Sequence, residues 1–406
     1  MTAPSLRTTC CIVGGGPAGM MLGLLLARAG VEVLVLEKHA DFLRDFRGDT
    51  VHPSTLEVIH ELGLLDDFLS RPHQKVSRLL GQVGGQAIVV AEFGRLNLHC
   101  PYIAMMPQWD FLDFLADHAR TYPNFHLRMN AKVTGLIEDQ GRITGVHVET
   151  PDGPLQIESG LVIGADGRGS VVRDQAGLTV QDLGAPIDVF WMRLSRKPND
   201  PNDSMGNFNP GSIFVLINRQ DYWQCAYVIP KDGAAEVRAH GLDAFRQQIA
   251  AIMPFLADRV GELTSWDEVK LLTVKVDRLT QWWRPGLLCI GDAAHAMSPV
   301  GGVGINLAVQ DAVAAANILA GPLTAGRLNW DHLKAVQKRR SFPARATQAI
   351  QVAVQNRIIH RVLTSRKPMR LPLPLRLLQR WPYLRGWTGY AVGVGVRPEH
   401  LKPSPR

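Results

Sequence analysis

The first forty residues pair two apolar runs with a cluster of glycines. Cys10–Val13 is a short apolar run, a glycine-rich segment occupies positions 14–19, and the apolar residues after it extend to about Ala29. This pattern predicts a buried strand, a tight turn and a helix capped by Gly30. The run VEVLVLE then predicts a second buried, parallel strand that ends on Glu37.

The glycines decide between three interpretations of this segment. A secretory signal or a membrane-spanning helix requires an unbroken apolar stretch, and Gly14–Pro17 interrupts it. Gly14, Gly16 and Gly19 instead stand at GxGxxG spacing after a strand, with Pro17 suited to the first turn of a helix. A glycine cluster alone is more often a plain turn, but the strand, helix, second strand and acidic end in register favour a cradle for a dinucleotide pyrophosphate.

Later patterns alternate between two kinds of segment. Helical periodicity begins near Pro53 or Ser54, recurs over 107–122 and again near Leu242–Leu256, and an antiparallel meander is predicted over 128–153. Strands are predicted within 75–100, before Asp166, over 187–195, 212–220 and 223–230, and before the long helix that follows residue 300.

The alternation predicts an α/β protein with two interleaved domains and a cleft between them. A Rossmann-like nucleotide-binding domain would comprise residues 1–70, 101–180 and 276–320. A sheet-rich substrate domain would comprise 71–100 and 181–275, and a basic helical segment would follow at 321–406.

The composition predicts a large hydrophobic core and a reducing environment. Of 406 residues, 46% are hydrophobic, which is enough to bury a sizeable core. The five cysteines are odd in number and show no CxxC or metal-ligand spacing, so neither a disulfide framework nor a metal site is predicted. A cytoplasmic location is the simplest expectation.

The net charge of +7 arises in the carboxy-terminal segment. No acidic residue lies between Asp331 and Glu399, whereas 14 Lys and Arg do, which leaves 30 basic against 37 acidic residues elsewhere. Such a block can dock on an anionic membrane or an acidic partner, or its helices can pack on the main domain with charged faces in water, and the second interpretation is favoured. No recognised nucleic-acid module accompanies the charge, so nucleic-acid binding is not expected.

Two further loops carry candidate chemistry. IGADGRGSVVRDQAG places Asp166 at the end of an apolar strand, ahead of Ser170 and Arg173, and CIGDAAHAMSPVGGVGINLAVQDA does the same with Asp292. Open α/β sheets bind ligands at the carboxyl ends of their parallel strands, so ligand contact is expected at both loops.

Together, the three motifs resemble the single-component (group A) FAD-dependent aromatic hydroxylases, the p-hydroxybenzoate hydroxylase-like monooxygenases, over about residues 7–320. The resemblance implies FAD as cofactor and NADPH or NADH as co-substrate. It implies that dioxygen reacts with reduced flavin to give a C4a-hydroperoxide, which hydroxylates an electron-rich aromatic or heteroaromatic small molecule.

The resemblance also implies roles for particular residues. Gly14, Gly16, Gly19 and Glu37 would hold the ADP half of FAD. Arg47, in RGDTVHPSTLEVI, matches the mobile-flavin loop near FAD and substrate, against the alternative of a surface loop charge. Gln108 matches a flavin-contacting glutamine, against the alternative of an ordinary helix start.

The resemblance implies roles for the residues of the two later loops as well. Asp166, Gly167, Ser170 and Arg173 would serve FAD and nicotinamide binding, and Asp292 would bind the ribitol. Pro299 and the backbone from Gly301 to Asn306, including Gly302 and Gly304, would lie against the flavin ring. Arg47 and Pro299 are thereby the residues expected nearest the chemistry, while His295 is expected to shape its loop rather than to act as a base.

Alternatives to hydroxylation of a soluble aromatic compound stay open. A membrane-associated quinone-ring hydroxylase would use the basic tail. A flavin-dependent halogenase would carry WxWxIP where this chain reads CAYVIP, with Cys225 and Tyr227 in place of the tryptophans. A non-catalytic flavin-binding scaffold is a third alternative.

Four aromatic residues are candidates for the wall of the substrate cleft. Trp191, Tyr222, Trp223 and Tyr227 lie on predicted strands of the sheet-rich domain. They either line the cleft or form ordinary core. The expected partners are an aromatic small molecule and dioxygen, with the chain a monomer or homodimer.

Overall fold

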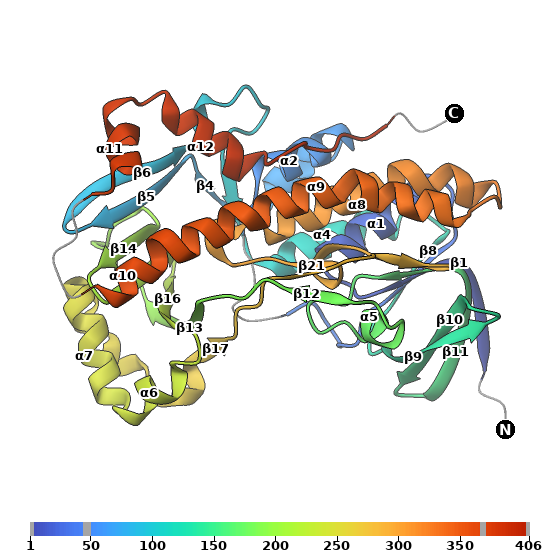
Figure 1. The fold of residues 1–406 in the computed structure, drawn as a ribbon, viewed down its shortest axis with the longest axis horizontal. Helices are drawn as coiled ribbons and strands as arrows, with labels where there is room; N and C mark the ends of the chain where they lie inside the picture. Colours follow the sequence, from blue (N-terminus) through green and yellow to red (C-terminus); the bar gives the residue numbers. More distant parts are fainter. Residues whose placement is uncertain (1–3, 44–49, 366–370, 403–406) are drawn as a thin grey trace.

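The computed structural model describes residues 4–43, 50–365 and 371–402, and shows two large sheets joined by long helices (Figure 1). The α/β class and the carboxy-terminal helices predicted from the sequence are confirmed. Arg47 lies outside the described residues.

The first sheet has eight strands, and its centre is parallel. Its order is β19-β20-β11-β1-β2-β8, with β10 pairing with β11 and β9 with β10. The pairs β1–β11, β1–β2, β2–β8 and β11–β20 are parallel. The strands are β1 (Ser5–Val13), β2 (Val33–Leu36), β8 (Phe125–Arg128), β9 (Lys132–Asp139), β10 (Arg142–Thr150), β11 (Gly153–Gly164), β19 (Trp283–Arg284) and β20 (Leu287–Cys289).

Helix α1 (Pro17–Arg28) is the central helix of this domain. All its residues from Ala18 to Ala27 are buried, because it packs between the sheet and the helices α4 (Gln108–Ala119) and α8 (Gly304–Thr324). An all-apolar helix of this kind belongs to a protein interior. The predicted helix end near Ala29 is confirmed, since Ala29 is the C-cap.

By length and composition, Val300–Thr324 is the one described helical segment that could cross a membrane. However, 78% of its most apolar stretch is buried within the fold, so α8 is a core helix.

The second sheet has seven strands in the order β17-β13-β16-β15-β14-β5-β6. All neighbouring pairs are antiparallel except β14–β5. The strands are β5 (Arg78–Val83), β6 (Gln86–Glu92), β13 (Ile187–Ser195), β14 (Met205–Asn209), β15 (Ser212–Asn218), β16 (Tyr222–Pro230) and β17 (Lys270–Leu272). The sheet therefore combines segments from both sides of the residue 101–180 region, although the exact domain boundaries stay a prediction.

Helix α7 (Leu242–Ile252) covers one face of this sheet, next to α6 (Ala234–Ala239). The predicted helix extended to Leu256, but α7 ends at Ile252 and a 3₁₀ turn begins at Pro254. Proline has no N–H to continue the helix, which explains the early end.

Shorter elements connect the two sheets. Two three-stranded sheets have the orders β3-β7-β4 and β12-β18-β21. Their strands are β3 (Thr50–Val51), β4 (Gln74–Val76), β7 (Ile103–Met105), β12 (Val180–Asp182), β18 (Asp277–Leu279) and β21 (His295–Ala296), and the short helices are α2 (Pro53–Glu61), α3 (Leu65–Ser70) and α5 (Val171–Gln175).

The carboxy-terminal segment runs along the whole molecule. Helix α9 (Trp330–Val354), a π-helical turn (Gln355–Ile359) and α10 (His360–Thr364) follow one another without a break, from β19 of the first sheet to β15 of the second (Figure 1). Helices α11 (Leu373–Arg380) and α12 (Leu384–Gly393) then pack against β6.

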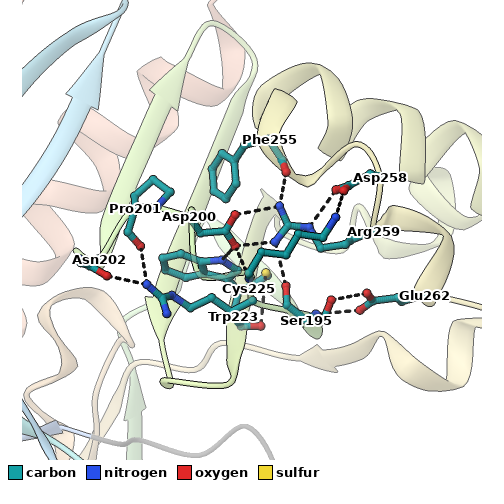
Figure 2. A network of polar contacts seen from close by, with 12 residues as sticks. Ser195, Asp200, Pro201, Asn202, Trp223, Cys225, Phe255, Asp258, Arg259 and Glu262 are labelled. Carbon is teal, nitrogen blue, oxygen red and sulfur yellow. Dashed lines mark hydrogen bonds and ion pairs between the residues drawn. The ribbon is translucent and has the colours of Figure 1, made fainter.

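A buried ion pair fixes the loop between β13 and β14 (Figure 2). Arg259 donates to both carboxylate oxygens of Asp200, at 2.5 and 3.0 Å, and Trp223 Nε1 donates to Asp200 Oδ2 at 2.9 Å. Burial by itself raises the pKa of Asp200, but the hydrogen bonds from Arg259, the Lys197 N–H and Trp223 outweigh it and lower the pKa to about 2.

We predict that Asp200→Asn destabilises the protein by about 3 kcal/mol, because it leaves the buried Arg259 guanidinium without its main counter-charge. Urea unfolding at neutral pH measures the loss. Asp203→Asn, at an exposed position of the same loop, is the matched control and should leave stability unchanged. Equal stability of the two variants would contradict the assignment.

Candidate functional site

Three loops meet at the carboxyl ends of the parallel strands β1, β11 and β20. A methyl group added at Gly14, after β1, would lie 2.4 Å from Ala165 O, after β11. A methyl group at Gly291, after β20, would lie 3.0 Å from Ala18 Cβ on α1. The loops therefore touch one another, and the parallel strand order brings the three predicted motifs to one place.

The glycines of the first loop have different constraints. Gly14 has φ +108°, and a methyl group at Gly19 would lie 1.9 Å from Gly14 O, so the chain itself requires glycine at both positions. A methyl group at Gly16 would have no neighbour within 4 Å. Gly16 is also the N-cap of α1 and makes no side-chain cap, so the helix start is open on the side where a phosphate would bind.

Glu37 lies beside this cradle at the end of β2. Its Oε2 accepts a hydrogen bond from Gly15 N at 3.0 Å, and its Oε1 accepts one from His39 N at 3.1 Å. The carboxylate is thus held next to the glycine loop, at the position expected for a ribose contact.

The loop after β11 is organised by Asp166. Asp166 Oδ1 accepts from Ser170 Oγ at 2.5 Å and Oδ2 accepts from Val172 N at 3.2 Å, while Ser170 Oγ caps α5 by accepting from Arg173 N. Burial raises the pKa of Asp166, and these hydrogen bonds oppose the rise. Gly167 has φ +83°, a conformation that favours glycine.

Arg173 is buried and faces the strand β18 rather than open space. Its two Nη atoms lie 3.3 and 3.4 Å from the two carboxylate oxygens of Asp277, and Nη2 donates to Arg168 O at 2.7 Å. The residue predicted to bind cofactor is therefore engaged in a structural ion pair. That role holds the Asp166 loop on β18, and any cofactor role stays a prediction.

Arg168 connects the second and third loops. Its Nη2 donates to Asp292 Oδ2 at 3.2 Å, and both side chains are about one-third exposed. Its Nη1 is buried and, among the described residues, has no hydrogen-bond partner. A buried donor without a partner is costly, and a ligand oxygen beside Asp292 would satisfy it.

The predicted flavin loop is held by β3. Gly301 and Gly302 have φ +81° and +64°. Thr50 Oγ1 donates to Gly302 O at 2.9 Å, and His52 Nε2 lies 3.2 Å from Gly301 O. Pro299 begins the turn, and α8 starts at Gly304 without a side-chain cap; a methyl group at Gly304 would meet nothing within 4 Å.

Asn306 joins the start of α8 to α2. Its Oδ1 lies 2.6 Å from Ser54 Oγ and 3.1 Å from Thr55 Oγ1, and all three residues are buried. Gln108 is half-buried at the first position of α4. The side-chain oxygen of Asn306 is therefore occupied by α2, and the predicted flavin contact of its backbone stays a prediction.

His52 is a site residue that the sequence analysis missed. It is fully buried between β3 and the flavin loop, and burial lowers its pKa to about 4, although hydrogen bonds to the backbone at Gly301 and Thr50 oppose the change. A neutral imidazole can donate from Nε2 to Gly301 O, which leaves Nδ1 as an acceptor with no partner among the described atoms. The sequence offered one indication of this residue, because His52 directly precedes Pro53, where a helix is predicted to begin.

His295 lies in the core and supports its loop. Its Nε2 lies 2.6 Å from Asp311 Oδ2 on α8, and the same oxygen accepts from Gly291 N at 3.0 Å. Arg340 Nε on α9 donates to Asp311 Oδ1 at 2.8 Å. Burial favours a raised pKa for Asp311, but His295 and Arg340 reverse this and lower it, so the carboxylate stays charged and holds the Asp292 loop.

Strand alternation separates the four candidate aromatics. Trp223 and Tyr227 face α7 within a core cluster that includes Phe245 and Phe190. Trp191 and Tyr222 project from the opposite face, since Trp191 pairs with Ala226 and Ser195 with Tyr222. Trp223 and Tyr227 therefore fill the core instead of the expected wall, with the Trp223 ring held by Asp200 (Figure 2).

The hydrogen-bond donors around the three loops are suited to binding FAD. The Gly16 and Gly304 positions are open where a ligand must approach closely, two helix starts lack side-chain caps, and Arg168 Nη1 lacks a partner beside Asp292. Together these features offer N–H donors to phosphate, ribityl and flavin oxygens.

Comparisons with known proteins agree with this geometry. A family model described as "FAD binding domain" matches residues 7–350. The 6-methylpretetramide 4-monooxygenase of Streptomyces rimosus is 32% identical over 88% of this chain and 85% of its own length. The resemblance stated from the sequence motifs is confirmed.

Solved structures show the same fold at lower identity. P. aeruginosa PqsL, solved in complex with 2-aminobenzoylacetate, superposes with a TM-score of 0.75 at 21% identity, over 88% of this chain and 98% of PqsL. The flavin-dependent brominase Bmp2 has a TM-score of 0.75 at 17% identity, over 96% and 94%. At these identities the likeness shows the fold alone, and the family assignment rests on the sequence matches.

We predict that His52 makes stability depend on pH. Its pKa of about 4 when folded lies below the ordinary 6.5, so its contribution is complete above pH 6.5 and is lost as the pH falls toward 4. By pH 4.5 the loss should be about 2–3 kcal/mol. Urea unfolding of wild type and His52→Asn from pH 7.5 to 4.5 should show a shallower decline in the variant. Exposed His240→Asn is the control, and parallel profiles for wild type and His52→Asn would refute the prediction.

Proposed function

Since the chain belongs to the FAD binding domain family, we propose that it is an FAD-dependent monooxygenase that uses NADPH or NADH and dioxygen to hydroxylate an electron-rich aromatic or heteroaromatic small molecule. The observation that supports this most is the meeting of three loops around a glycine cradle that the protein's own packing leaves open at Gly16. When bound, FAD supplies electron transfer from NAD(P)H and the activation of dioxygen.

The proposed binding mode follows the chain's donors. Gly16 and the start of α1 hold the pyrophosphate, and Glu37 accepts from the adenosine ribose. Asp292 and Arg168 hold the ribityl hydroxyls and a neighbouring phosphate, because they offer an acceptor and a donor side by side. The backbone from Gly302 through the first turn of α8 contacts the flavin ring.

Thr50 and His52 set the orientation of that backbone. They hold the carbonyls of Gly301 and Gly302 toward β3. A trans peptide directs its N–H opposite to its C=O, so the Val303 N–H points away from Thr50. An N–H held in this way stabilises negative charge on a facing oxygen without reorganising during the reaction.

Trp191 is the best-supported substrate contact. It lies on the sheet face opposite α7 and packs on an apolar cluster that Val300 of the flavin loop also contacts. Its indole Nε1 is buried and has no hydrogen-bond partner among the described residues. We propose that the indole donates to an oxygen of the substrate, with Tyr222 on the same face, and that Trp223 and Tyr227 take no direct part.

A cytoplasmic location is part of the proposal. All five cysteines are buried free thiols, which supports a reducing compartment.

The deciding experiment is an anaerobic absorption spectrum of the purified protein, before and after NADPH and then NADH. A yellow protein whose flavin band bleaches with either nucleotide supports the proposal. A colourless protein that also fails to take up added FAD contradicts it. A flavin that stays oxidised even with candidate aromatics present indicates a separate reductase, as for partner-reduced flavoenzymes.

We further predict that Gly16→Ala lowers FAD content at least about tenfold, because the methyl group occupies the space a pyrophosphate needs. Apoprotein stability should be unchanged, since this methyl group meets no protein atom within 4 Å. The ratio of flavin to protein absorbance and thermal unfolding of the apoprotein measure the two effects. Gly261→Ala, whose methyl group also meets open space, is the control, and full flavin content in Gly16→Ala would refute the prediction.

A further inference from the structure

Helices α11 and α12 present a set of large apolar side chains to solvent. We call this set the aromatic patch: Leu373, Trp381, Tyr383, Trp387 and Tyr390. Tyr383, Trp387 and Tyr390 are spaced i, i+4 and i+7, so they share one side of α12. Trp387 is 76% exposed, which is unusual for tryptophan in the absence of a binding partner.

The opposite side of α12 is fixed to the protein. A methyl group at Gly389 would lie 2.6 Å from Glu92 O, and one at Gly393 would lie 2.9 Å from the Phe93 ring. Thr388 Oγ1 donates to Val90 O at 2.6 Å. The helix cannot rotate to bury its aromatic side, because its glycine side fits against β6 and the turn after it.

Helix α11 is fixed to the same edge strand. Gln379 accepts from Val89 N at 3.3 Å and donates to Val89 O at 3.0 Å, as a neighbouring strand would. Arg385 donates to Leu378 O at 2.9 Å and joins the two helices. The aromatic patch therefore stands on a rigid support at one end of the molecule (Figure 1).

The exposed charges on α11 have one sign, and the nearby Glu92 of β6 is paired with Arg95. Arg376 and Arg380 are exposed on α11, and the sequence contains no acidic residue between Asp331 and Glu399. Tryptophan and tyrosine prefer the interface between water and lipid, and arginine at that depth interacts with anionic headgroups. This combination is typical of a surface that lies on a membrane.

A second copy of the chain fits less well. A twofold contact would place each patch against its own copy. The arginines of one patch would then face those of the other with no carboxylate in this segment to neutralise them.

We propose that the aromatic patch, with Arg376 and Arg380, docks the enzyme on an anionic lipid surface. The docking lies outside the FAD-binding residues and does not depend on the proposed reaction. It would bring the enzyme to substrates that partition into lipid.

The test is co-sedimentation of the full-length holoenzyme with vesicles of phosphatidylcholine alone and with about 30% phosphatidylglycerol. Wild type should sediment with the anionic vesicles, and about 0.5 M NaCl should weaken binding. Trp387→Ala/Tyr390→Ala should lower the binding constant about tenfold or more, and Arg376→Gln/Arg380→Gln should remove most of the salt dependence. Trp330→Ala, at a tryptophan that is also well exposed but lies on α9, is the matched control and should bind as wild type.

Flavin absorbance and thermal unfolding of each variant confirm that it is folded. Wild type that sediments no more with anionic vesicles than without lipid overturns the proposal, as does a Trp387→Ala/Tyr390→Ala variant that binds like wild type. If light scattering shows a dimer that this variant dissociates, a second copy covers the patch and the membrane assignment is wrong.

Discussion

The candidate site depends on the hydrogen bonds and ion pairs of one buried carboxylate, that of Asp311 in the first domain. One carboxylate oxygen holds Gly291 N and His295, and the other holds Arg340 of α9. The strand β20, the loop that carries Asp292 and the long carboxy-terminal helix are thereby fixed to α8. A buried carboxylate is tolerated only where such partners compensate for lost hydration, so each of these contacts supports the others.

The middle and the later half of the long helix α9 hold several loops of the FAD-binding part in place. Near its middle, Arg340 pairs with Asp311 in the FAD-binding part. In its later half, Gln348 donates to Asp277 O and Ala296 O, and Gln351 to Ser298 O and Val300 O. The same helix therefore supports the strand that receives Arg173 and the loop that would contact the flavin. Positions of the Asp166 loop and the flavin loop are set by one rigid element.

Local patterns predicted the first strand-turn-helix-strand unit well, but they did not predict the long-range contacts that support the loops. Gly14, Gly16, Gly19 and Glu37 stand within one strand-helix-strand unit, so spacing alone indicated their arrangement. The family resemblance gave Arg173 a cofactor role, which stays a prediction, but its ion pair with Asp277, 104 residues away, is a contact that no local pattern reveals. For the aromatics, the two-residue period separates Tyr222 from Trp223 and Tyr227, but only the position of α7 shows which face is core. His52 carried no periodic signal, since its role comes from contact with a loop about 250 residues later.

Residues 399–401 add contacts to the ion network at the centre of the first domain. Glu399 lies 3.4 Å from Arg340 Nη1 and 2.6 Å from Arg339 Nε, while its backbone N–H donates to Gln310 of α8. His400 and Leu401 N then contact Glu61 of α2. On the ribosome, residue 399 emerges long after α1, α2 and α8 have been synthesised. The contacts of Glu399 with α8 and α9 therefore form late, and they can add to the nucleotide-binding core only after its helices have been synthesised.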